Sequence, residues 1–147
     1  MKTFKKWVLG AGVFNVIVAF PLAIPFTANY FYTFWNFLNH LFNLGGQDLV
    51  LPKDGNNLLW INTCGLALFL VGLMLLYASR DLKNRMGIPL LNGIIRVVFS
   101  IFVVYYVVVA DISRIILIIA IIDVIIAIVF FYYYRILTNK KDKKNCW

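Results

Sequence analysis

The sequence has no glutamate, a single histidine and only two cysteines, and charged residues make up 14% of its 147 residues. Hydrophobic residues make up 63%, and the mean hydropathy is +0.86. A soluble domain has about 45–50% apolar and about 25% charged residues. The composition therefore predicts an integral membrane protein, with one membrane domain over residues 1–147 and no room for a separate soluble domain.

The scarcity of histidine and cysteine argues against metal, haem and disulfide chemistry. A haem or a metal would need a second ligand beside His40. Cys64 lies in an apolar run and Cys146 in a basic tail, so their spacing fits neither a zinc site nor a disulfide framework. The sequence also has no phosphate-binding loop, nucleophile elbow or paired carboxylates. We therefore expect no cofactor, no metal and no ordinary enzyme activity.

The net charge of +8 has two interpretations: nucleic-acid binding, or basic residues that flank membrane spans. The second fits the low acidic count better, so we expect a lipid bilayer as the surroundings and no nucleic-acid partner.

Four apolar runs are each long enough for a helix to cross a bilayer, which takes ~20 residues. They cover residues 7–27, 58–79, 88–110 and 114–135. The basic start and the first run resemble a signal peptide. However, Phe26 stands where cleavage before Ala28 would need a small residue, so we expect an uncleaved span. The predicted fold class is all-α, a polytopic membrane four-helix bundle with a tail at 136–147.

The loop at 28–57 contains a stretch, 29–44, that is aromatic and almost uncharged. Its polar residues recur at three- and four-residue steps, which places them in one narrow stripe of a helix. They are Asn29, Thr33, Asn36, His40 and Asn43. This pattern predicts an additional amphipathic helix that lies in the outer interface, with His40 as a solvated member of the stripe. The alternative is a lid folded over the outer mouth of the bundle.

Basic residues are distributed unevenly between the two predicted sides of the membrane. Eleven lysines and arginines fall on the side of the N-terminus, whereas only Lys53 and Arg114 fall on the other. Because basic residues are enriched on the cytoplasmic side, we expect both termini in the cytoplasm.

Polar residues inside the spans form a candidate intramembrane seam of Asn15, Asn92, Arg96, Ser100 and Asp123. Asn92, Arg96 and Ser100 are four residues apart and share one helical face. Arg96 and Asn15 share a depth of ~12–13 Å from their helix ends, whereas Asp123 lies ~5–6 Å deeper than Arg96. The seam can bind an anion or relay protons, or it can be a buried structural pair with interhelical amide bonds. The sequence does not decide whether Arg96 and Asp123 pair directly, because the Arg96 side chain can also extend to the membrane interface.

Two further patterns concern helix packing. Gly65 and Gly72, seven residues apart in the second span, predict a groove for a neighbouring helix. Asp111 or Ser113, in the corner between the last two spans, is expected to cap the last helix at its N-terminus.

Three features together resemble the many small uncharacterised bacterial four-span membrane proteins. They are Tyr77-Ala78-Ser79-Arg80-Asp81 at the end of the second span, Arg96 early in the third, and Asp123 before the aromatic run Phe130-Phe131-Tyr132. The resemblance covers mostly residues 58–135. It implies a bacterial inner membrane and brings no assigned activity.

Three functions are compatible with these observations. The favoured one is a non-enzymatic accessory or assembly protein that acts through lateral helix contacts, with a membrane-protein partner or a second copy of the chain. The second is a small oligomeric transporter or channel that uses Arg96 and Asp123. The third is a lipid- or quinone-binding membrane subunit.

Overall fold

The computed structural model describes residues 1–142, with side chains described up to residue 138. Predictions for Cys146 and for the side chains of the four tail lysines lie outside this part. The described residues form five helices, α1 (Lys2–Ala23), α2 (Ala28–Leu41), α3 (Gly55–Arg80), α4 (Gly87–Val109) and α5 (Ile116–Asp142). Four of them, all except α2, are long and apolar enough to cross a membrane. The all-α fold with four candidate spans is therefore confirmed.

The helix ends differ from the ends of the apolar runs. α1 begins at Lys2 and α5 continues to Asp142, although the apolar runs start at 7 and end at 135. Hydropathy marks the part of a helix that fits the membrane, whereas breakers and caps decide where the helix itself ends. α1 shows such a breaker: it ends at Ala23, and Ile24 before Pro25 is extended, with φ −111° and ψ 123°. The segment predicted as a tail is thus helical up to residue 142.

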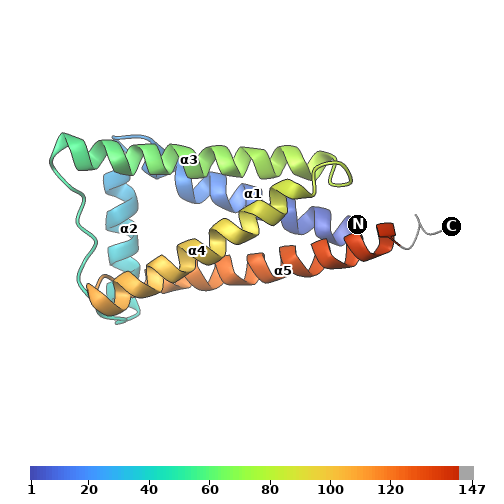
Figure 1. The fold of residues 1–147 in the computed structure, drawn as a ribbon. Coiled ribbons are helices and arrows are strands. Elements are labelled where there is room, and N and C mark those ends of the chain that lie inside the picture. The colour runs from blue at the N-terminus through green and yellow to red at the C-terminus, as the bar shows by residue number, and fades with distance from the viewer. Residues whose placement is uncertain (143–147) are drawn as a thin grey trace.

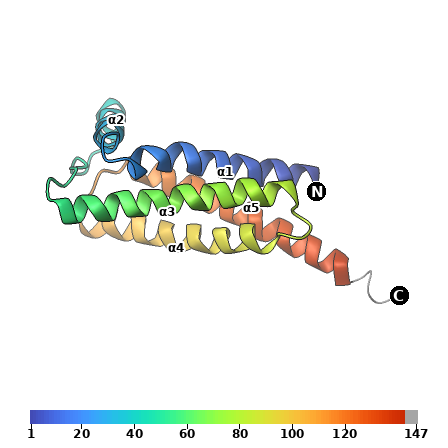
Figure 2. The ribbon, with the colours of Figure 1, turned by 90° about the horizontal axis from the view of Figure 1, so that it is seen from above.

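α1 and α3 form one closely packed antiparallel pair (Figures 1 and 2). Glycines on α3 permit this approach. A Cβ added to Gly65 would lie 2.5 Å from the backbone nitrogen of Ala23, and one added to Gly72 would lie 3.0 Å from that of Val16. Small residues let membrane helices pack backbone to backbone. The predicted glycine groove is confirmed, and α1 is the helix that occupies it.

α4 and α5 form the second antiparallel pair, and the two pairs share a buried apolar cluster at the end that holds the N-terminus and the last described turns of α5 (Figure 1). There the buried apolar cluster joins α1, α3 and α5. It comprises Phe4, Val8, Ala11, Leu75, Ala78, Leu82, Ile126 and Phe130. The Phe4 ring stacks on Tyr133 at 5.0 Å and meets Phe130 edge-on at 6.0 Å. Toward the opposite end the α4–α5 pair diverges from the α1–α3 pair.

α2 runs across the other helices near the end away from the termini (Figure 1). Figure 2 shows it nearly end-on, on the α1 side of the bundle and away from α3 and α4. A helix that is transverse to four spans is not itself a span. The predicted additional helix is therefore present, and it reaches from the α1–α3 pair to the turn between α4 and α5.

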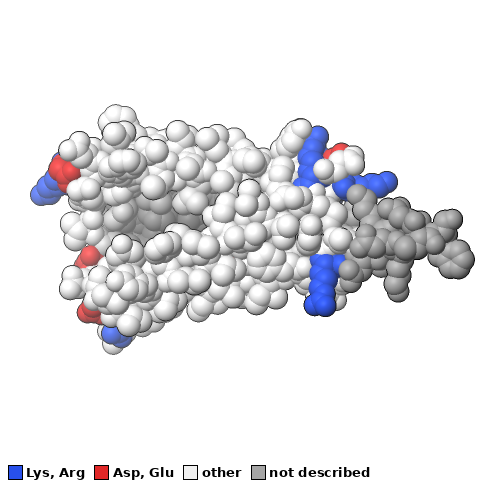
Figure 3. Space-filling view, in the orientation of Figure 1, with Lys and Arg blue, Asp and Glu red and all other residues white. Residues whose placement is uncertain are grey.

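Charged side chains gather at the two ends of the molecule and leave a broad uncharged middle (Figure 3). Lysines and arginines dominate the end that holds the N-terminus, while aspartates lie with a few basic residues at the end of α2. The uncharged band and the four apolar helices are those of an integral membrane protein.

Candidate functional site

The structure brings four of the five seam residues together at one guanidinium. Arg96 on α4 is 3% exposed and Asp123 on α5 is 6% exposed, and they form a direct ion pair through Nη1 and Oδ1. The Arg96 Nε donates to Asn92 Oδ1 at 2.7 Å, and its Nη2 donates to Asn15 Oδ1 at 2.6 Å. Three helices therefore meet at one guanidinium, and Arg96 does not extend to the interface.

The estimate from helix ends placed Arg96 and Asp123 at different depths, which left direct contact open. That estimate assumed parallel helices of equal tilt. Figure 1 shows α4 crossing α5 at an angle. Residues at unequal distances from their helix ends can then reach one level, and the long arginine side chain covers the remaining distance.

Ser100, the fifth seam residue, lies apart from the guanidinium. Its hydroxyl is 2.8 Å from the carbonyl of Arg96 and 3.2 Å from the carbonyl of Ala120 on α5. A serine hydroxyl has one hydrogen to donate, so these two acceptors share it. Ser100 therefore ties α4 to α5 one turn beyond the ion pair.

The ion pair is neutral as a unit and still has hydrogen-bonding capacity. A guanidinium has five N–H donors, and the bonds to Asn15, Asn92 and Asp123 use three of them. Arg96 Nη1 donates to Oδ1 of Asp123, and this bond uses one of the two carboxylate oxygens. The second carboxylate oxygen is thus an acceptor beside the spare donors of Arg96.

A cavity of about 210 Å³ lies between the two helix pairs, and the ion pair forms one end of it. Its walls are almost entirely apolar. They include Val18 and Leu22 of α1, Leu68 and Val71 of α3, Ile95 and Phe99 of α4, and Ile116 and Ile119 of α5. Three of these side chains, Leu68, Ile95 and Phe99, are exposed rather than buried. In Figure 3 the surface is hollowed between α3 and α4, toward the end of α2. The cavity therefore opens sideways, in the plane that the bilayer would occupy.

Aromatic residues of α2 line the cavity at the end away from the ion pair. They are Phe31, Tyr32 and Trp35, with Leu49 of the following loop. Burial raises the pKa of the Tyr32 hydroxyl above its ordinary value of 10.0. The indole Nε1 of Trp35 is buried and has no hydrogen-bond partner among the described residues. An indole N–H is a donor only, so Trp35 carries an unused donor in the wall of the cavity.

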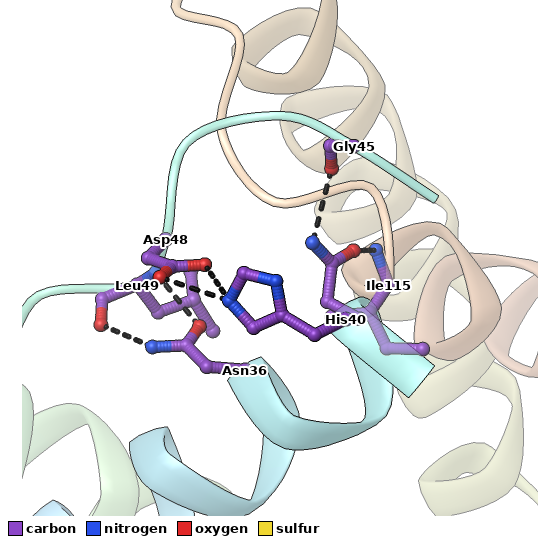
Figure 4. A network of polar contacts seen from close by, with 7 residues as sticks. Asn36, His40, Gly45, Asp48, Leu49 and Ile115 are labelled. Carbon is purple, nitrogen blue, oxygen red and sulfur yellow. Dashed lines mark hydrogen bonds and ion pairs between the residues drawn. The ribbon is translucent and has the colours of Figure 1, made fainter. Parts of the chain in front are cut away.

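Side chains of α2 tie it to its own following loop (Figure 4). The amide of Asn36 pairs with the backbone of Leu49 in both directions, each bond being 2.9 Å long. His40 contacts Asp48 at 3.0 Å while remaining exposed. His40 is therefore a solvated member of the polar stripe, as predicted.

Asn39 joins α2 to α5 and was not recognised in the sequence. It is 2% exposed, donates to the carbonyl of Gly45 at 3.2 Å and accepts from the backbone N–H of Ile115 at 3.3 Å (Figure 4 shows Gly45 and Ile115). The sequence signal for it is slight: Asn39 lies between the apolar Leu38 and the predicted stripe member His40, off the stripe itself.

The loop after α2 rests on the turn between α4 and α5. Gln47 N–H donates to the carbonyl of Asp111 at 2.7 Å, and Arg114 N–H donates to the carbonyl of Gly45 at 3.2 Å. Gly46 has φ +84°, and a Cβ there would lie 2.6 Å from the carbonyl oxygen of Ile112. This position thus requires glycine for both its backbone angle and its contact.

The prediction that Asp111 or Ser113 caps α5 is wrong. The Ser113 hydroxyl is buried without a hydrogen-bond partner among the described residues, and Asp111 has a positive φ of 46° in the turn. Asn39 instead accepts the N–H of Ile115, immediately before α5. The side chain that serves this helix start comes from α2.

No family model, curated protein or solved structure was found to match this chain. The resemblance to small bacterial four-span proteins therefore stays a prediction, and any function must be argued from the cavity and the residues that line it.

Proposed function

We propose that this membrane protein binds an amphiphile, taken laterally from the bilayer, in the cavity between its two helix pairs. The observation that carries the proposal is the sideways-opening cavity of about 210 Å³ with a buried ion pair at one end. Of the three functions drawn from the sequence, a lipid- or quinone-binding membrane subunit is the one that this geometry supports best.

The chemistry of the lining fits an amphiphile. Ligand sites are mostly apolar, with a few polar groups that fix orientation. Here the apolar walls would contact a hydrocarbon chain, while Arg96, Asp123 and their amide partners would contact a head group. Because the opening lies between α3 and α4, the ligand could enter without leaving the hydrocarbon layer.

A matched pair of neighbouring residues on α4 provides the test. Ile95 lines the cavity and Ile94 does not, although both are partly exposed. Wild-type protein extracted from membranes should carry a bound amphiphile in native mass spectrometry. Ile95→Trp should lose it because the larger ring fills the cavity, whereas Ile94→Trp should keep it. Equal binding by both variants, or no bound amphiphile in the wild type, would contradict the proposal.

We infer a binding role rather than catalysis, and the other two functions remain alternatives. An accessory or assembly role would be supported by a membrane protein that copurifies at a constant ratio. Transport would be supported by ion or proton flux in liposomes that is lost on changing Asp123. The mutual satisfaction of Arg96 and Asp123 gives more support to a fixed pair than to a moving charge.

We further propose that both termini are cytoplasmic and that the membrane is a bacterial inner membrane. The orientation follows from the bias of eleven basic residues against two. The membrane follows only from the resemblance of residues 58–135 to bacterial four-span proteins.

A further inference from the structure

We propose that the ligand's head group is an uncharged ring that carries carbonyl oxygens, the chemistry of isoprenoid quinones. This inference rests on the proposed function, because it names the class of amphiphile that the cavity would bind. Three properties carry it: the charge balance of the lining, the unused N–H donors of the lining residues Arg96 and Trp35, and the size and aromatic character of the cavity.

The charge balance favours an uncharged head group. Among the residues that line the cavity, Arg96 is the one cation and Asp123 the one carboxylate, and they pair directly. A phosphate head group would bring a second anion to a cation that is already compensated. Burying an uncompensated charge is strongly unfavourable. An uncharged head group avoids this penalty.

The unused donors favour carbonyl oxygens. Trp35 lines the cavity at the α2 end, and its buried Nε1 is a donor without a partner among the described residues. Arg96 has two N–H groups beyond the three in its hydrogen bonds at the other end. Buried polar groups in folded proteins are nearly always hydrogen-bonded. A carbonyl oxygen accepts such bonds without a proton of its own, and a ring with carbonyls on opposite sides offers an acceptor to each end.

The size and walls of the cavity favour a ring. Its volume of about 210 Å³ lies below the ~300–1,000 Å³ of sites for drug-sized ligands. It therefore suits a compact head group better than a glycerol backbone with two chains. Four aromatic side chains face it besides Trp35, namely Phe14, Phe31, Tyr32 and Phe99. Aromatic rings pack well in offset or edge-to-face contact with a planar ligand, and an apolar tail would leave through the opening between α3 and α4.

The test uses the full chain in detergent micelles and the fluorescence of single tryptophans. One variant keeps Trp35 and replaces the other three tryptophans by phenylalanine. A matched variant keeps only Trp60, which is exposed and outside the cavity lining. Decylubiquinone, a short-chain quinone, should quench Trp35 saturably and Trp60 only in proportion to its micellar concentration. Equal quenching of the two tryptophans would overturn the inference.

A second measurement compares head groups by the rise in melting temperature. Decylubiquinone should raise it more than dioctanoyl phosphatidylglycerol, which is anionic, or dioctanoylglycerol, which is uncharged but has no ring. In the wild-type chain, Trp35→Phe should preserve the aromatic packing and weaken quinone binding about two- to tenfold, the effect of one hydrogen bond. A circular dichroism spectrum like that of the wild type shows that this variant is folded.

The outcomes separate this inference from the proposed function. A larger effect of phosphatidylglycerol would overturn the uncharged head group, and a larger effect of dioctanoylglycerol would overturn the ring. In both cases a lateral binding site that Ile95→Trp blocks would still stand. If none of the three probes acts and Ile95→Trp changes nothing, the proposed function fails as well.

Discussion

Asn39 on α2 accepts a hydrogen bond from the backbone N–H of Ile115, immediately before α5 begins. The same side chain donates to Gly45 in the loop that follows α2. One buried amide therefore holds three parts of the chain together: the transverse helix, its loop, and the start of the last span.

Replacing Asn39 should destabilise the fold. Asn39→Leu removes both bonds and leaves the backbone N–H of Ile115, a residue that is 1% exposed, without its partner, at a cost of ~1–3 kcal/mol for a buried unsatisfied group. The carbonyl of Gly45 keeps its bond from the N–H of Arg114. The free energy of unfolding, measured in detergent, should fall by at least that amount. His40→Ala is the control, since exposed ion pairs contribute ~0–1 kcal/mol. A similar loss in both variants would show that Asn39 has no special role.

The ion pair should behave as a unit. Arg96→Leu and Asp123→Leu each leave one buried charge uncompensated, which for a buried pair costs ~3–5 kcal/mol. The double variant should recover much of this loss because both charges are gone. Melting temperatures of the wild type and the three variants form a double-mutant cycle, which gives the coupling free energy of the pair. A coupling below ~0.5 kcal/mol would mean that the two residues do not interact.

The contact between α1 and α3 should be sensitive to a single methyl group. Gly65→Ala places a Cβ 2.5 Å from backbone atoms of α1, so the helices must separate. We expect a loss of ~1–3 kcal/mol from overpacking. Gly10→Ala is the matched control in α1, because nothing lies within 4 Å of its Cβ and alanine favours the helix. Chemical unfolding of both variants in one detergent measures the difference, and equal stabilities would contradict close packing at Gly65.

The topology has its own test. A reporter that is active only in the cytoplasm should work when fused after Trp147. A reporter that is active only outside the membrane should work when inserted near Asp54. Both expectations follow from the bias of eleven basic residues against two. Labelling of the C-terminal end from outside intact cells would exclude this orientation.

The spans and the seam could be predicted because their physics is local. Helices that cross a bilayer need ~20 apolar residues, and those runs are continuous here except for a few residues such as Arg96 and Asp123. Polar residues four apart must share a helical face, so Asn92 and Arg96 were placed together correctly. Gly65 and Gly72 of α3, seven residues apart, likewise predicted a groove for a neighbouring helix from their spacing alone.

The splay of the two helix pairs could not be predicted. In a membrane the same aliphatic residues face lipid and protein, so periodicity does not mark the contact faces. Leu68 and Ile95 look like any other lipid-facing residue in the sequence, yet they line the cavity. The role of Asn39 could not be predicted either, because the spacing of residues on a helix does not show which of them contact another segment. The stripe on α2 was read as solvated, and spacing does not show that a neighbouring amide is buried against another loop.

The two helix pairs are linked to each other at both ends of the molecule, and the two links differ in kind. At the end of the termini the pairs are joined covalently by the short connection from α3 to α4. At the α2 end they are joined by a noncovalent clasp, in which two of the bonds, Gln47 to Asp111 and Arg114 to Gly45, run from backbone to backbone. Side-chain substitutions at Gln47 and Arg114 leave the backbone donors of those bonds in place. Substitutions at Gln47 and Arg114 should therefore be tolerated. The sensitive positions are Gly45 and Gly46, whose φ angles are +80° and +84°, and Asn39, whose side chain makes two of the bonds at this end.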